Sequence, residues 1–154
     1  MSAAPDIAFF EPRIPGNTGN AIRLSACVGN VLHLIEPLGF EMDDAKLKRA
    51  GLDYHELSHF VTHTNFDAFL EAVGECRIFA FSSHATTNFS DVNFRSDDVL
   101  LFGPEPTGLP EEILNHTRVT EQLRIPMQEG VRSLNLAVSA SIAVYEGWRQ
   151  LDFG

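Results

Sequence analysis

The sequence predicts an α/β protein with a mostly parallel sheet and helices on both faces of that sheet. Four short segments are apolar almost throughout, at residues 7–10, 31–35, 78–81 and 99–102. Such continuous apolar runs are typical of strands that are buried on both faces. Segments with helix-forming patterns alternate with these runs along the chain, and this alternation predicts crossover units with parallel strands.

The first predicted helix follows the strand at residues 7–10. Asn17 or Thr18 is expected to cap it, because either side chain can accept a hydrogen bond from the free backbone N–H groups of a first turn. Gly29 is expected to end it, because glycine readily adopts the left-handed conformation that closes many helices. The strand at residues 31–35 comes next and stops at a Glu-Pro pair.

Two more helices are predicted before the strand at residues 78–81. Asp43 begins a short helix that runs through Leu47 toward Gly51. Asn65 caps the next one. Its apolar residues recur at helical spacing and share one face: Phe66, Phe69, Leu70 and Val73.

After the strand at residues 99–102, residues 109–112 open a helix. Its first turn carries a proline and two carboxylates, as the helix dipole prefers. Residues 118–125 are expected to form a last strand, and residues 133–151 a long terminal helix. No repeat, low-complexity stretch or linker interrupts the chain, so we predict a single domain over residues 1–154.

Composition limits the classes of function. The formal net charge of −10 at pH 7 argues against the basic surface of a nucleic-acid binder, unless the arginines gather on one face. No stretch reaches the roughly 18 apolar residues of a membrane span, and residues 1–6 carry no signal-peptide pattern. Cys27 and Cys76 fit no metal or redox spacing and are expected to be buried thiols in a reducing compartment. We therefore expect a soluble, cytoplasmic protein.

Three segments combine glycine, proline and polar residues directly after a predicted strand: 11–23, 103–110 and 125–135. In a parallel sheet, ligands bind outside the carboxyl ends of the strands, and glycine lets backbone groups approach a ligand closely. Neither the G-x-G-x-x-G fingerprint nor the P-loop motif is present. Three such loops, if they meet, would supply backbone partners for a nucleoside base and an apolar slot for its ring.

In this order, the three segments resemble the three motifs of the SPOUT (trefoil-knot) RNA methyltransferases. More narrowly, they resemble the TrmL-type tRNA wobble-nucleotide 2′-O-methyltransferases. Residues 32–56 (LHLIEPLGFEMDDAKLKRAGLDYHE) and 144–151 (VYEGWRQL) are similar to that family as well. The resemblance therefore extends over nearly the whole chain.

The resemblance implies a C-terminal deep trefoil knot and a homodimer with the first and last helices at its interface. It implies transfer of a methyl group from S-adenosyl-L-methionine to the ribose 2′-hydroxyl of the wobble nucleotide in tRNA, either cytidine or a modified uridine. The products are S-adenosyl-L-homocysteine and methylated tRNA, and no metal is required. The residues implied for cofactor binding border the knot: Phe81, Gly103, Ile125 and Ser133.

The same resemblance implies a catalytic set, which comprises Arg23, Asn17, Glu105, Ser133 and Asn135. In the family, the first-motif arginine is assigned to activating the substrate hydroxyl. A guanidinium stays protonated in nearly every protein, so we expect Arg23 to bind the adjacent RNA phosphate and to stabilise developing alkoxide charge. Tyr145 is a second candidate for RNA binding, and packing in the core or interface is the alternative for it.

The chain departs from the family pattern at three positions. Thr107 stands where relatives often carry arginine, Leu134 replaces a common methionine, and Ala137 stands where serine is usual. Losing a positive charge at Thr107 bears on RNA contact, and therefore on the choice of substrate and not on the reaction type.

Of three rival interpretations, the first is disfavoured and the other two stay open at this point. Residues 55–59 spell H-E-x-x-H, the zincin signature, but Gly51 closely precedes them and residues 60–62 favour a strand over a continuous zinc-binding helix. A methylase of the same fold that acts on ribosomal RNA is the second. A non-catalytic knotted RNA-binding dimer is the third.

Overall fold

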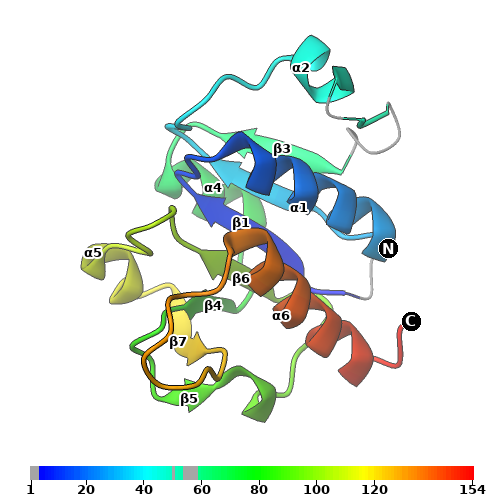
Figure 1. Cartoon of the computed structure of the whole chain (residues 1–154). Helices are drawn as coiled ribbons and strands as arrows, with labels where there is room; N and C mark the ends of the chain where they lie inside the picture. Colours follow the sequence, from blue (N-terminus) through cyan, green and yellow to red (C-terminus); the bar gives the residue numbers. More distant parts are fainter. Residues whose placement is uncertain (1–3, 50, 54–58) are drawn as a thin grey trace.

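The computed structural model describes residues 4–49, 51–53 and 59–154, and the described chain forms three layers with the sheet in the middle (Figure 1). Seven strands of this described part lie in the order β3-β2-β1-β6-β4-β7-β5, and their pairings are parallel. The strands are β1 (Asp6–Phe10), β2 (Leu32–Ile35), β3 (Phe60–His63), β4 (Ile78–Phe81), β5 (Thr87–Asn88), β6 (Val99–Phe102) and β7 (Val119–Arg124).

The helices cover both faces of the sheet. They are α1 (Pro15–Val28), α2 (Asp44–Arg49), α4 (Phe66–Val73), α5 (Glu111–Leu114) and α6 (Leu136–Gln150), with a 3-10 turn η1 at Phe89–Asp91. Helices α1 and α6 lie side by side on one face (Figure 1), and residues of α4 and α5 pack against the other.

Alternation along each strand divides the core between the two faces. In β1, Ile7 and Phe9 pack with α1 and α6, whereas Ala8 and Phe10 pack with α4 and α5. This follows from the two-residue period of a strand, which sends successive side chains to opposite faces. All four are buried, so the apolar runs in the sequence correctly predicted strands covered on both sides.

The start of the first helix was predicted wrongly. Helix α1 begins at Pro15, and the cap position is Ile14, which makes no side-chain cap hydrogen bond. Proline suits this first helical position because its ring fixes φ near the helical value and it lacks the N–H that would remain free. Asn17 and Thr18 therefore lie inside the first turn. The end was predicted correctly, since Gly29 has φ of 80° and donates its N–H to the Ser25 carbonyl.

The terminal helix also begins later than predicted. Helix α6 starts at Leu136 and ends at Gln150, so residues 133–135 belong to the preceding loop. Asn135 caps it, because Oδ1 accepts hydrogen bonds from the N–H groups of Ala137 (2.9 Å) and Val138 (3.2 Å). Strand β5 was missed, because its two residues are polar and carry no apolar pattern.

The amino end of the sheet is held together by buried polar contacts. Asp98 precedes β6 and is fully buried, and Arg77 precedes β4. The Arg77 guanidinium donates to both carboxylate oxygens of Asp98, at 2.8 and 2.7 Å, and the N–H of Arg95 donates to the same carboxylate at 2.7 Å. Two charged-group donors and one backbone donor compensate for the desolvation of this carboxylate.

A second polar chain crosses β1, β2 and β3 on the face covered by α4. Asp6 Oδ2 lies 3.3 Å from His33 Nε2, and His33 Nδ1 lies 2.9 Å from His63 Nε2. The two imidazoles stack with centroids 5.2 Å apart, and both pack edge-on against Phe69. Burial, together with the neighbouring His33, lowers the pKa of His63 below 6.5.

Some expectations are corrected or stay open. Cys27 is exposed and Cys76 half-buried, so the expected burial of Cys27 is wrong. Residues 55–58 of the H-E-x-x-H sequence lie outside the described residues, and so does the zinc-site interpretation that rests on them. Residues 60–63 do form a strand, as expected. The knot and the single domain over residues 1–154 stay predictions. In the described chain no helix combines the length and apolarity that crossing a membrane takes.

Candidate active site

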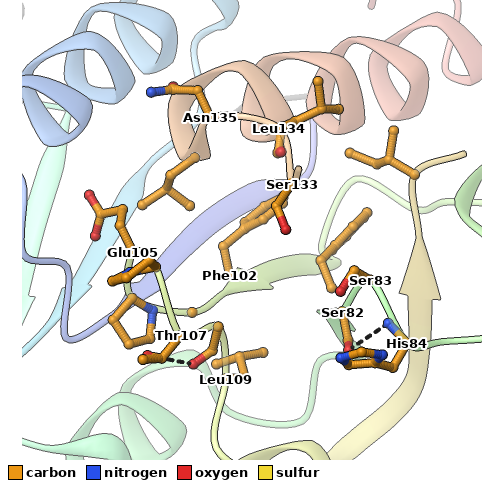
Figure 2. A pocket seen from close by; sticks show the side chains of 18 of the residues that line it. Ser82, Ser83, His84, Phe102, Glu105, Thr107, Leu109, Ser133, Leu134 and Asn135 are labelled. Atoms are coloured by element: carbon orange, nitrogen blue, oxygen red, sulfur yellow. Dashed lines mark hydrogen bonds between the residues drawn. The ribbon is translucent and has the colours of Figure 1, made fainter. Parts of the chain in front are cut away.

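The carboxyl ends of the strands open onto one large cavity of about 1100 Å³. Its lining comes from the segments that follow β1, β4, β6 and β7 (Figure 2). Each of the three loops predicted from the sequence, at residues 11–23, 103–110 and 125–135, contributes to it. The expectation that these distant turns meet is therefore confirmed. The cavity is slightly larger than the roughly 300–1,000 Å³ of most small-molecule sites.

The predicted cofactor residues line this cavity together: Phe81, Gly103, Ile125 and Ser133. Phe81 also stacks on Phe102, with centroids 4.6 Å apart and planes 16° apart. Both rings are buried at the ends of neighbouring strands, so they form a rigid apolar wall. Such a wall suits the flat ring of a nucleoside base.

Gly103 is required by a close approach of the backbone. A Cβ at this position would overlap the backbone of Gly108 and Leu109. The loop that follows β6 folds back on itself, and the N–H of Gly108 donates to the Pro104 carbonyl at 2.8 Å. Gly108 has φ of 74°, in the left-handed region that favours glycine. The two glycines therefore set the path of this loop at the cavity wall.

Asn17, Glu105 and Asn135 form one hydrogen-bond network at the edge of the cavity. Asn17 Nδ2 donates to Glu105 Oε2 at 2.8 Å, and Asn135 Nδ2 donates to Asn17 Oδ1 at 2.9 Å. These side chains come from α1, from the loop after β6 and from the cap of α6. The network thus joins all three predicted loops. Asn135 also caps α6, so one side chain both starts the helix and ties it to α1.

The Glu105 carboxylate also accepts hydrogen bonds from the backbone N–H groups of Arg13 (2.9 Å) and Ile14 (3.2 Å). Burial raises the pKa of this carboxyl, but the hydrogen bonds from Asn17, Arg13, its own backbone and Ile14 together lower it below 4.5. The Glu105 side chain is therefore an ionised carboxylate whose oxygens already accept hydrogen bonds from within the protein. This geometry suits it to holding the loops in place rather than to taking a proton.

Arg23 and Tyr145 lie elsewhere. Neither is among the described residues that line the cavity. Arg23 is exposed on α1, and its Nη2 donates to the carbonyl of Gly51 at 2.7 Å. Tyr145 is 43% exposed on α6, with its ring edge-on to Trp148 at 5.6 Å. The structure thus brings together Asn17, Glu105, Ser133 and Asn135, and it places Arg23 and Tyr145 on the surface.

Some lining residues were named in the sequence only as departures from the family pattern, and others were missed. Thr107 and Leu134 line the cavity, so two of the three departures from the family pattern fall inside the site. His84 and Arg132 also line it and were not singled out. Arg132 directly precedes Ser133 in the third loop, so its position in a predicted ligand loop was a usable signal.

A parallel sheet with a cavity at its carboxyl edge, built from three glycine-bearing loops and an apolar wall, defines an α/β protein with space for a nucleoside-sized ligand. The chain belongs to the SpoU rRNA Methylase family, whose model matches residues 6–145. It is a methyltransferase of the SPOUT fold, and the resemblance found in the sequence is confirmed.

Known relatives agree along the length of the chain. A tRNA (cytidine(34)-2′-O)-methyltransferase of Aeromonas hydrophila is 53% identical over 148 residues, which are 96% of this chain and 95% of that protein. A solved structure described as "Structural insights into the 2-OH methylation of C/U34 on tRNA" is 49% identical, with a TM-score of 0.85 and coverage of 96% and 90%. The SpoU methyltransferase AviRb from Streptomyces viridochromogenes, solved in complex with AdoMet, is 23% identical with a TM-score of 0.83. That match covers 100% of this chain and 63% of AviRb, and it shows the fold.

Proposed function

We propose that this protein transfers a methyl group from S-adenosyl-L-methionine to the ribose 2′-hydroxyl of the wobble nucleotide in tRNA, cytidine or a modified uridine. The observation that carries the proposal is the meeting of the three motif loops on one cavity, in a chain 53% identical to a tRNA (cytidine(34)-2′-O)-methyltransferase. The site of action would be the cytoplasm, where tRNA is used.

The lining of the cavity supports the proposed binding of S-adenosyl-L-methionine. The stacked pair Phe81 and Phe102 offers an apolar wall for adenine, and Gly103 and Ile125 bring backbone groups to its edge. A Cβ at Gly103 would displace the loop after β6, which borders this wall. When bound, the cofactor supplies an already activated methyl group. The protein then has to align the hydroxyl with that methyl and to exclude water.

We assign Asn17, Glu105 and Asn135 to positioning. Their network holds α1, the loop after β6 and the start of α6 in one arrangement at the cavity edge. Alignment of reacting groups can lower a reaction barrier by up to roughly 7–11 kcal/mol. A network that fixes three loops at the cavity edge contributes to this alignment. Ser133, which is exposed in the third loop, is assigned to contacting the ligands directly.

We assign Arg23 to the RNA. A charged guanidinium can bind a phosphate and stabilise charge that develops on the ribose oxygen, and neither role needs its deprotonation. Its exposure on α1 supports access to a macromolecular substrate. Tyr145 is the second proposed RNA contact, because its ring is exposed beside Trp148.

We further propose a homodimer that joins through α1 and α6. Helix α6 exposes apolar side chains at helical spacing, and the stripe is continued at the loop before it: Leu134, Val138 and Ile142, each 37–46% exposed. Contiguous exposed apolar residues of this kind mark a protein interface. Sedimentation equilibrium would test the dimer, and a monomer at micromolar concentration would contradict it.

The decisive experiment is methyl transfer to separated RNA fractions. The purified protein, supplied with methyl-labelled S-adenosyl-L-methionine, should label tRNA from cells lacking the protein, and mapping should place the 2′-O-methyl group at the wobble nucleotide. Label confined to ribosomal RNA would replace the substrate but keep the reaction. No label in either fraction, with cofactor binding intact by calorimetry, would leave the non-catalytic RNA-binding dimer.

The Arg23→Ala variant tests the role of the guanidinium. We expect it to bind S-adenosyl-L-methionine as the wild type does and to lose at least about 100-fold in methyl transfer, the loss of ~2.7 kcal/mol or more that a transition-state contact carries. Single-turnover rates measure it. Activity within about threefold of wild type would refute the assignment.

A further inference from the structure

Arg132 is the only lysine or arginine among the described residues that line the cavity. Two carboxylates share this lining, those of Glu105 and Glu111. The Glu105 carboxylate is occupied by hydrogen bonds from Asn17 and from two backbone N–H groups. Arg132 differs, because its exposed guanidinium makes no hydrogen bond or ion pair with another residue of the described chain.

The surroundings of Arg132 favour an anion. It lies four residues before the start of α6, a 15-residue helix that carries no acidic residue in its first turn. The positive end of the helix dipole therefore adds to the field of the guanidinium. The N–H groups of Ala137 and Val138 donate to Asn135, so Arg132 is the positively charged group of this loop that is left to meet an anion.

We propose that Arg132 binds an anionic oxygen group of the ligands that occupy the cavity. The proposal rests on the proposed function, which supplies two such groups: the carboxylate of S-adenosyl-L-methionine and a phosphate of the tRNA. Both present paired oxygens, and the guanidinium donates to such pairs through two parallel N–H groups. In a chain with a net charge of −10, this cation compensates locally for the negative charge of the ligand.

The experiment compares Arg132→Gln with wild type on two cofactor forms and on tRNA. Calorimetry measures the affinity for S-adenosyl-L-methionine and for its decarboxylated form, which keeps the amino group but lacks the carboxylate. Steady-state kinetics measures KM for tRNA at two salt concentrations. Arg95→Gln is the matched control, because it removes the same charge from an exposed position at the amino end of the sheet. Thermal unfolding of both variants checks that the fold is kept.

A carboxylate contact predicts that Arg132→Gln lowers the affinity for S-adenosyl-L-methionine at least about tenfold, since hydrogen bonds to charged groups carry that much binding energy. The affinity for the decarboxylated form should stay within threefold of wild type. A phosphate contact predicts unchanged cofactor affinity, a KM for tRNA raised about tenfold and a weaker dependence on salt. In either case Arg132→Lys should recover part of the loss, because lysine keeps the charge but not the paired donors.

Wild-type affinities and KM in Arg132→Gln, within threefold, would overturn this inference while leaving the proposed function intact. Equal losses in Arg132→Gln and Arg95→Gln would also overturn it, because they would report total charge instead of a contact. A wild-type protein that neither binds S-adenosyl-L-methionine nor methylates tRNA would overturn the proposed function and this inference with it.

Discussion

The two ends of the parallel sheet are built from the same kinds of polar residue but use them differently. At the amino end, Arg77 and Asp98 pair with each other, and Asn30 donates to the Pro5 carbonyl at 2.6 Å. At the carboxyl end, Glu105 and Asn135 tie loops together around an open cavity. The first arrangement pairs the Asp98 carboxylate and the Asn30 amide N–H with groups of the protein itself. The second positions groups around space for a ligand.

This difference teaches where stability and function reside in the chain. Polar contacts at the amino end join segments that directly precede strands, and the sheet separates them from the cavity. Breaking them should therefore lower stability without changing the cavity. Contacts at the carboxyl end join segments far apart in sequence and border the cavity, so changing them should affect ligand binding or alignment first. Substitutions at each end can separate the two.

The largest effect on stability is expected from Asp98→Asn. It removes the charge from a fully buried carboxylate and leaves the Arg77 guanidinium without its ionic partner. We expect the free energy of unfolding to fall by about 3–5 kcal/mol, as when one member of a buried ion pair is removed. Urea unfolding measures it.

Arg149→Gln is a control for Asp98→Asn, since it breaks the pair of Arg149 with Glu146 on the surface of α6. This variant should lose far less stability, because solvent screens an exposed pair. At a temperature where the Asp98→Asn variant is folded, the affinity of Asp98→Asn for S-adenosyl-L-methionine should match that of the wild type. A tenfold loss of affinity there would show that the two ends are coupled, contrary to the comparison.

Gly103→Ala should have the largest effect at the carboxyl end. The added methyl group overlaps the backbone of Gly108 and Leu109, so the loop after β6 must move. Overpacking of this kind costs about 1–3 kcal/mol. If that cost falls on the ligand loop, calorimetry should find the affinity for S-adenosyl-L-methionine lowered about 10- to 100-fold, with a smaller change in unfolding.

Gly16→Ala is the matched control for Gly103→Ala, because a Cβ at Gly16 meets nothing within 4 Å. It should bind the cofactor as wild type does. If Gly103→Ala kept wild-type affinity, the position of the loop after β6 that the close approach at Gly103 fixes would not matter for cofactor binding.

Asn135 allows a finer separation, because it both caps α6 and donates to Asn17. Asn135→Ala removes both interactions and should cost about 1 kcal/mol of stability, the usual value of a lost helix cap. Asn135→Asp keeps an oxygen for the cap but has no N–H to donate to Asn17. We therefore expect near-wild-type stability with reduced methyl transfer at unchanged cofactor affinity. Full activity in Asn135→Asp would show that the link to Asn17 is dispensable.

The sequence predicted the fold better than the roles of single side chains. Strand positions followed from apolar runs, because burial on both faces of the sheet leaves a local pattern. From its residue type, Asn17 was predicted as a helix cap. Its actual partners, Glu105 and Asn135, lie 88 and 118 residues away, and contacts at that separation leave no local pattern in the sequence. Pro15, the first residue of α1, was the stronger local cue. The three loops were predicted from glycine and proline, but which of their side chains bond one another depends on how the chain folds.

The smallest expected effect is the dependence of stability on pH, which distinguishes Glu105 from His63 in the polar chain of Asp6, His33 and His63. The pKa of His63 lies below 6.5 because of burial and the neighbouring His33, so the folded state disfavours its protonation. As pH falls below 6.5, the unfolded chain gains a proton that folded His63 resists, and stability declines. The pKa of Glu105 lies below 4.5, so Glu105 stays ionised in this range and its stabilising hydrogen bonds are lost only at lower pH. Unfolding free energies at pH 7.5 and 5.5 should therefore differ less in His63→Gln than in wild type, with Asp6 and His33 still in place. Parallel declines in the two proteins would assign the pH dependence to groups other than His63.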